Sequence, residues 1–131
     1  MNRKKILVVD DEPDIITYLD VLLENNGYRM LQARSAQEAF SVLKMIKPDL
    51  ICLDIMLPKK SGLALYCDLK LDEDLKDIPT IFMSAFSLAR DFQGKGFRNL
   101  IPDPRVPEPE AFMEKPVKAE KLIEIIKQTI D

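Results

Sequence analysis

Acidic residues stand at the ends of two short apolar runs, where buried strands would finish. Residues 6–9 (ILVV) lead directly into Asp10 and Asp11, and residues 50–54 (LICLD) end in Asp54. Like charges at the end of a buried strand repel one another, so this ending costs free energy unless something compensates for it. Ligands of open parallel sheets bind beyond the carboxyl ends of the strands. We therefore expect the three carboxylates to converge on one edge of a sheet.

Two charge arrangements would let three carboxylates share one edge. One or more of them could hold a proton, or a cation could lie among them. Mg²⁺ suits the second arrangement, because it is a small hard cation that prefers oxygen ligands and would keep the acids ionised. A carboxylate beside Mg²⁺ can act as a nucleophile toward a phosphoryl group, so Asp54 is a candidate for forming an aspartyl phosphate.

Two further polar residues follow later apolar runs. Ser84 ends residues 80–84 (TIFMS), and Lys115 comes directly after residues 111–114 (AFME). A lysine is a mobile point charge that can contact one phosphoryl oxygen, and a serine hydroxyl can donate a hydrogen bond to another. Phosphoryl transfer depends mainly on positioning and charge neutralisation. Together with Asp54, these two residues form a set suited to that reaction.

The elements that must position these residues alternate along the chain between apolar runs and helical patterns. Apolar runs at residues 6–9, 28–33, 50–54, 80–84 and 111–114 predict five strands. Apolar residues at helical spacing predict helices at about residues 13–27, 35–47, 63–71 and 118–129. This alternation predicts a single α/β domain, residues 1–131, with a doubly wound parallel sheet and helices on both faces.

Residues 86–110 interrupt the alternation. Four prolines fall within residues 102–109, and a helix cannot run through them, because proline lacks an N–H and clashes with the preceding turn. A short helix could precede Gly94, and we expect a long Pro-rich, extended loop at about residues 94–110. The fourth helix region should therefore be irregular. A loop of this length is either functional or mobile, or it is a solvated excursion without a role.

Composition narrows the classes of function. The chain has 131 residues, 47% of them apolar, and a net charge of −3, which argues against a nucleic-acid-binding surface. It contains no histidine, so any phosphohistidine must belong to a partner. No apolar run approaches the length of a membrane span, and we expect a cytoplasmic protein. Cys52 and Cys67 are expected to be buried free thiols in a reducing compartment.

Four motifs in this order resemble the receiver domain of two-component response regulators, a CheY-like family with a flavodoxin-like sheet of strand order 2-1-3-4-5. The motifs are VVDDE (8–12), LICLDIMLPKKSG (50–62), IFMSA (81–85) and FMEKP (112–116). Each motif alone is a weak signal, but all four stand at or near the ends of predicted strands. The resemblance covers nearly the whole chain apart from residues 86–110.

The resemblance implies a role for the acidic residues. Asp54 matches the phosphoacceptor of the family. Asp11 matches the direct Mg²⁺ ligand, and Asp10 matches its neighbour, which often acts through water. Met56 would offer its backbone carbonyl to the metal. The implied cofactor is therefore Mg²⁺, held by Asp10, Asp11, Asp54 and Met56.

The resemblance also implies a switch and a set of partners. Lys115 matches the lysine that contacts the phosphoryl group, Ser84 the switch residue, and Phe112 an aromatic that swings inward when the switch residue moves. The implied function is to accept a phosphoryl group from a sensor histidine kinase or histidine phosphotransfer protein, and then to control a downstream protein. Such a domain catalyses its own phosphorylation and dephosphorylation without being a conventional enzyme. No nucleic acid or membrane is contacted through it, and a homodimer is compatible with it.

Two other functions compete with this interpretation. The first is a receiver-like protein-interaction module that is not phosphorylated. The second is a Mg²⁺-dependent phosphohydrolase with an Asp nucleophile; such enzymes carry a second Asp two residues later, where this chain has Met56. Because no output domain follows Asp131, we expect either a stand-alone receiver or part of a longer protein.

Overall fold

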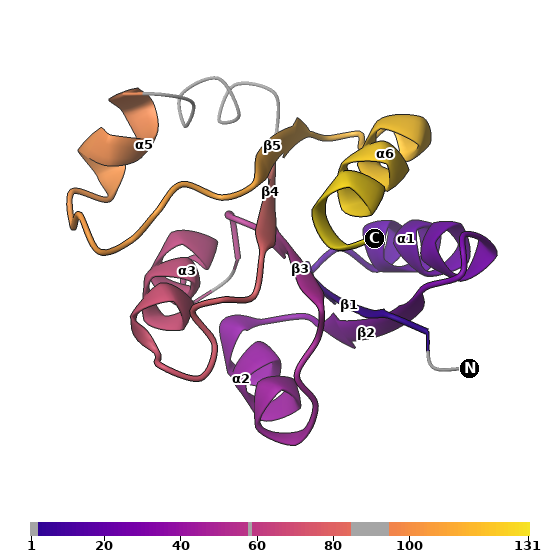
Figure 1. Cartoon of the computed structure of the whole chain (residues 1–131), viewed down its shortest axis with the longest axis horizontal. Helices are drawn as coiled ribbons and strands as arrows, with labels where there is room; N and C mark the ends of the chain where they lie inside the picture. The colour runs from indigo at the N-terminus through magenta and orange to yellow at the C-terminus, as the bar shows by residue number, and fades with distance from the viewer. Residues whose placement is uncertain (1–2, 58, 85–94) are drawn as a thin grey trace.

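Five strands form one parallel sheet in the order β2-β1-β3-β4-β5 (Figure 1). The computed structural model describes residues 3–57, 59–84 and 95–131. Its strands are β1 (Lys5–Val9), β2 (Arg29–Ala33), β3 (Leu50–Asp54), β4 (Thr80–Ser84) and β5 (Ala111–Glu114). The predicted flavodoxin-like, doubly wound sheet is therefore confirmed.

Helices cover both faces of this sheet. α1 (Pro13–Asn25) and α6 (Ala119–Ile130) lie on one face, and α2 (Ala36–Met45) and α3 (Gly62–Leu71) lie on the other (Figure 1). Successive side chains of a strand point to opposite faces, so β1 supplies both apolar clusters: Ile6 and Val8 pack with α1 and α6, whereas Leu7 and Val9 pack on the other side. Strands buried on both faces explain the continuous apolar runs of the sequence.

Local hydrogen bonds fix where the helices begin. The Ser35 hydroxyl accepts a hydrogen bond from the Glu38 N–H at 3.1 Å, and the Ser61 hydroxyl accepts one from the Ala64 N–H at 3.1 Å. The Glu38 carboxylate accepts from the N–H of Arg34 at 3.2 Å. Side-chain caps of this kind satisfy N–H groups that have no partner inside the helix. They therefore fix where the loops after β2 and β3 end and where α2 and α3 begin.

The segment before β5 differs from its predicted structure. α5 (Lys95–Leu100) is a short helix, so the expectation of an extended loop over residues 94–110 was wrong for this part. The prolines begin only at residue 102 and do not prevent a helix before them. Phe97, Ile101 and Val106 are buried in the apolar cluster that also contains residues of α2 and α3. The α5 segment, residues 95–110, is therefore anchored to the domain. Ala85 and the predicted short helix before Gly94 lie outside the described residues.

Two smaller expectations concern membranes and cysteines. Among the residues that the structure describes, no helix combines the length and the apolar character that a membrane span requires. Cys52 and Cys67 are both free thiols. Cys52 is fully buried, and burial raises its pKa to about 12. Cys67 is only partly buried, so the expectation of two buried thiols holds fully for Cys52 alone.

Candidate functional site

The pairing of the strands brings the predicted site residues to one edge of the sheet. β1 and β3 are parallel neighbours with Val9 opposite Leu53, so Asp10 and Asp54, which follow these residues, end adjacent strands. β4 and β5 are also neighbours, and the N–H of Lys115 donates a hydrogen bond to the carbonyl of Ser84 at 2.7 Å. Acids, a hydroxyl and an ammonium therefore lie together at the carboxyl ends of the strands. This is the edge at which open parallel sheets bind ligands.

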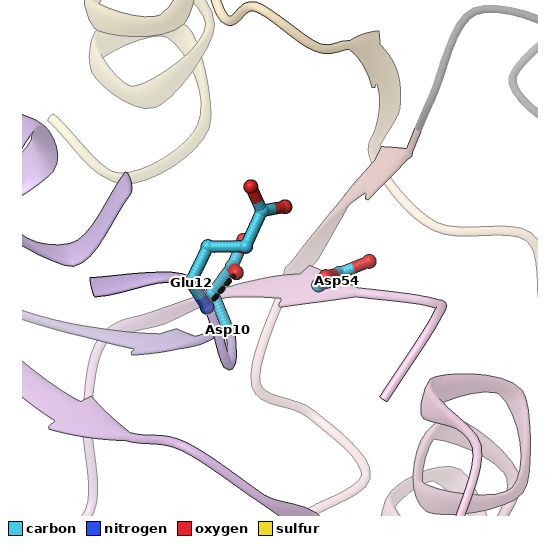
Figure 2. A group of neighbouring side chains, drawn as sticks. All are labelled: Asp10, Glu12 and Asp54. Atoms are coloured by element: carbon cyan, nitrogen blue, oxygen red, sulfur yellow. Dashed lines mark hydrogen bonds between the residues drawn. The ribbon is translucent and has the colours of Figure 1, made fainter. Parts of the chain in front are cut away.

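Three carboxylates form a cluster at this edge. Figure 2 shows Asp10, Glu12 and Asp54, each of which has a carboxylate oxygen within 4.8 Å of the others. Asp10 and Asp54 are buried, whereas the Glu12 side chain is 56% exposed. The backbone orients both buried acids: the Glu12 N–H donates to Asp10 Oδ1 at 2.9 Å, and the Met56 N–H donates to Asp54 Oδ1 at 2.9 Å. The second oxygen of each aspartate is left to other partners.

Lys115 is the cation that faces these acids. Its Nζ lies 2.8 Å from Asp10 Oδ2, 2.8 Å from Glu12 Oε1 and 3.0 Å from Asp54 Oδ2. It donates hydrogen bonds to Glu12 and Asp54 and forms an ion pair with Asp10. Burial lowers the pKa of Lys115, but the three carboxylates outweigh burial and raise the pKa above its ordinary value. Lys115 is therefore a charged ammonium at neutral pH.

Asp54 is a buried acid whose surroundings disfavour its ionised form. Burial raises its pKa above the ordinary value of an aspartate, while the Met56 N–H and the Lys115 ammonium act in the opposite direction. A carboxylate is a nucleophile only when it is ionised. Cationic charge beside Asp54 therefore decides how readily the residue can react at neutral pH.

The donor set fits a small divalent cation. When all three acids are ionised, three negative charges face the single positive charge of Lys115. In addition, Asp10 is fully buried, with the Lys115 ammonium 2.8 Å from its Oδ2. A buried carboxylate is strongly destabilising unless positive charge compensates for it. Carboxylate oxygens in excess of positive charge are the ligands that Mg²⁺ prefers, so these residues fit that ion.

The roles of Asp11 and Met56 as metal ligands stay predictions. Asp11 is half-buried and does not belong to the three-carboxylate cluster, in which Glu12 is present instead. Met56 contributes its N–H to Asp54, and its side chain points outward with the residue 61% exposed. Sequence reasoning missed Glu12. The strand pattern gives no signal for Glu12, because β1 ends at Val9 and the turn that follows decides which acid faces Lys115.

Of the two predicted switch residues, Ser84 lies at the site edge of the sheet, and Phe112 is partly buried and packs against the apolar core. Ser84 is buried at the end of β4. Phe112 on β5 is opposite Phe82 on β4 in the strand register, and the two rings pack edge-on with centroids 5.6 Å apart. Phe112 therefore belongs to the aromatic packing on the α3 side of the sheet.

Gly62 is a second residue whose importance the sequence does not reveal. A Cβ atom at this position would lie 2.2 Å from the carbonyl oxygen of Asp54, so only glycine fits without a shift of the backbone. The Gly62 N–H also donates to the carbonyl of Ile55 at 3.1 Å. The start of α3 is thereby packed against the backbone of Asp54 and Ile55 at the end of β3. In the sequence, Gly62 is only the last residue of the motif at residues 50–62, with no sign of this close contact.

Comparison with known proteins agrees with this geometry. The profile of the response regulator receiver domain matches residues 6–96. The DivK polar-differentiation response regulator of Brucella ovis is 36% identical over 127 residues, covering 97% of this chain and 95% of DivK. The PhoB phosphate regulon transcriptional regulator of Pseudomonas aeruginosa is 49% identical over 85 residues, 65% of this chain. This match spans only 37% of PhoB.

Solved structures show the same fold. The receiver domain of a signal transduction histidine kinase from Syntrophus aciditrophicus superposes with a TM-score of 0.81 at 32% identity, covering 97% of this chain and 89% of that one. The receiver domain of the sensor histidine kinase PA1611 from Pseudomonas aeruginosa has a TM-score of 0.79 at 23% identity, with 98% of each chain covered. The latter structure is described with a magnesium ion coordinated in its active site cleft.

Proposed function

Since this chain belongs to the response regulator receiver domain family, we propose that it accepts a phosphoryl group on Asp54 with Mg²⁺ bound beside it. One observation carries the proposal: a buried aspartate, a lysine ammonium 3.0 Å from its Oδ2, and a second buried aspartate on the same ammonium lie at one sheet edge. This arrangement provides a nucleophile together with the positive charge that phosphoryl transfer needs.

The phosphoryl donor is a phosphohistidine of a sensor histidine kinase or a histidine phosphotransfer protein. The chain has no histidine of its own, so the donor belongs to another protein. A carboxylate oxygen of Asp54 attacks the phosphorus atom, the P–N bond breaks, and the imidazole nitrogen keeps the electron pair. Hydrolysis reverses the modification: water attacks the phosphorus, phosphate leaves, and the Asp54 carboxylate is restored.

Each neighbouring residue has a distinct task in this reaction. The Met56 N–H holds Asp54 Oδ1 in place, Lys115 neutralises one phosphoryl oxygen, and the Ser84 hydroxyl donates to another. Asp10 and Asp54 would hold Mg²⁺, with Asp11, Glu12 and the Met56 carbonyl as further ligand candidates. When bound, Mg²⁺ supplies charge neutralisation for the phosphoryl oxygens.

Phosphorylation controls a downstream protein by shifting a conformational equilibrium. Ser84 lies at the end of β4, and Phe112 packs on Phe82 of the same strand. A phosphoryl group that engages Ser84 can therefore change the packing of Phe112 and bias one of two conformations. The domain acts as a switch in the cytoplasm and not as a conventional enzyme.

Binding of beryllofluoride, which mimics a phosphoryl group on a carboxylate, tests the proposal. We expect Mg²⁺-dependent binding to the wild-type protein, no binding to Asp54→Ala, and unchanged binding to the matched control Asp20→Ala, which changes an exposed acid on α1. Isothermal titration calorimetry measures all three. Equal binding to wild type and Asp54→Ala, or none to wild type, would instead favour the non-phosphorylated interaction module.

A further inference from the structure

All donors of the Lys115 ammonium face protein carboxylates. A lysine ammonium has three N–H groups, and three carboxylate oxygens surround Lys115 Nζ at 2.8, 2.8 and 3.0 Å. A phosphoryl oxygen on Asp54 must also contact this ammonium in the proposed function. One of the three carboxylates therefore has to give up its place when the phosphoryl group arrives.

The three carboxylates differ in how easily they can leave. Asp10 is fully buried, and its Oδ1 is held by the Glu12 N–H. Asp54 is buried, and the phosphoryl group bonded to it would bring further anionic oxygens to the same ammonium. The Glu12 carboxylate is 56% exposed, so it can turn into water. Breaking an exposed ion pair costs little, whereas a buried charge that loses its partner is strongly destabilising.

We propose that Glu12 is a positioning residue for Lys115, which holds the ammonium over Asp54 before phosphorylation and then yields its place to a phosphoryl oxygen. This inference rests on the proposed function and adds to it a residue that the sequence motifs do not single out. Glu12 thus keeps Lys115 in place before phosphorylation but does not prevent a phosphoryl oxygen from binding the ammonium afterwards.

The backbone at Glu12 supports an exchange that involves only the side chain. Glu12 is the N-cap of α1, with an extended backbone conformation, and its N–H is bound to Asp10. These contacts do not involve the Glu12 carboxylate, so they persist when that carboxylate leaves Lys115. The geometry of Asp10 is therefore preserved while the ammonium changes partners.

A double-mutant cycle tests whether Glu12 acts through Lys115. The variants are Glu12→Gln, Lys115→Met and the combination, with Glu114→Gln as a matched control that removes an exposed charge beside Lys115 in the sequence. The measured quantity is the dissociation constant of beryllofluoride at saturating Mg²⁺, followed by ¹⁹F nuclear magnetic resonance. Such a cycle isolates the coupling between two residues.

We expect Glu12→Gln to tighten beryllofluoride binding by about 2- to 5-fold, the range for releasing one exposed ion pair. The gain should disappear in the Lys115→Met background, and Glu114→Gln should bind like wild type. Equal tightening with and without Lys115 would show that Glu12 acts only through its charge, and would overturn the inference. Unchanged or weaker binding in Glu12→Gln would overturn it as well.

A second measurement needs neither the metal nor a phosphoryl mimic, and it remains decisive if Lys115→Met does not fold. The ¹⁵N signal of the Lys115 ammonium in the metal-free protein should show faster hydrogen exchange with water in Glu12→Gln, but not in Glu114→Gln. Unchanged exchange in Glu12→Gln, with intact beryllofluoride binding by wild type, would overturn this inference alone. Absence of beryllofluoride binding by wild type would overturn the proposed function and this inference together.

Discussion

Two regions of the molecule are stabilised by different interactions: the site formed by Asp10, Glu12, Asp54 and Lys115, and the α5 segment. The site gathers the carboxylates of Asp10, Glu12 and Asp54 around the ammonium of Lys115. The α5 segment buries Phe97, Ile101 and Val106 in the apolar core, and the carbonyl of Pro107 accepts a hydrogen bond from the Tyr66 hydroxyl at 2.6 Å. The α5 segment is therefore held by apolar packing and a hydrogen bond, whereas the site carries an excess of negative charge that Mg²⁺ would compensate in the proposed function.

This difference predicts that the two regions can be perturbed separately. Burial of apolar side chains stabilises the folded chain without involving charged groups or bound ions. Clustered charges respond to cations and to pH. Variants in the α5 segment should therefore lower stability without changing the response to Mg²⁺, whereas variants in the site should change that response.

Phe97→Ala should have the largest effect. Phe97 is fully buried, and its ring lies 6.3 Å from that of Tyr66 and 6.4 Å from that of Phe82, measured between centroids. Removal of a buried phenylalanine side chain typically costs about 3–5 kcal/mol. Urea denaturation should show this loss, with a smaller loss for Phe97→Leu. The stabilisation by Mg²⁺ should be the same as in wild type, and its disappearance would mean that the two regions are not independent.

Addition of Mg²⁺ should have the next largest effect. At about 100 times its dissociation constant, a ligand that binds only the folded state raises the free energy of unfolding by about 2.7 kcal/mol. Asp10→Asn should lose most of this increase, because it removes a buried carboxylate of the cluster. Asp103→Asn, which changes an acid of the α5 segment, serves as the control and should retain it. Thermal unfolding with Mg²⁺ and with EDTA measures the difference, and a full increase in Asp10→Asn would argue against the site.

Tyr66→Phe should lower the free energy of unfolding by a moderate amount, because it removes one hydrogen bond to the α5 segment. The Tyr66 hydroxyl donates to the carbonyl of Pro107, and a hydrogen bond of this kind contributes about 0.5–1.5 kcal/mol to stability. The ring itself remains, so its edge-on contact with Phe82 at 4.7 Å is kept. Chemical denaturation gives the loss, and the dissociation constant of Mg²⁺ should not change. A weaker affinity for Mg²⁺ would show coupling between the two regions.

The smallest effect expected is a pH dependence of stability that comes from Asp54. Burial raises its pKa in the folded state, and the Met56 N–H and Lys115 offset part of that increase. The ionised form is therefore disfavoured by folding, and wild type should lose stability relative to Asp54→Asn as the pH rises from the ordinary aspartate pKa of about 3.9 through the folded value. Without Mg²⁺, the variant should be more stable at pH 7 than wild type, and the gap should narrow toward pH 4. A gap that widens toward pH 4 would contradict the assigned direction.

The sequence predicted the fold and the meeting of several candidate residues at one edge of the sheet, because both depend on short patterns. Apolar runs buried on both faces identify strands, and the residues that follow them must lie at one edge of a parallel sheet. The meeting of Asp10, Asp54 and Lys115 follows from this topology. Whether Asp11 or Glu12 faces Lys115 depends on the backbone turn between β1 and α1, which the pattern does not specify.

The α5 segment was harder to predict because its structure comes from distant contacts. The prolines exclude a helix over residues 102–109 but not before them, and Phe97 and Ile101 have the four-residue spacing of one helix face. Their burial depends on the space available beside Tyr66 and Phe82. Likewise, the close approach of Gly62 to the Asp54 carbonyl is a tertiary contact that no local pattern reveals.

The most direct test of the central claim is the intact mass of the protein after incubation with acetyl phosphate and Mg²⁺. The account predicts that wild type gains the mass of one phosphoryl group, that EDTA prevents the gain, and that Asp54→Ala shows none. A gain of the same size in Asp54→Ala, or no gain in a wild-type protein that is folded and binds Mg²⁺, would contradict the assignment of Asp54 as the phosphoacceptor.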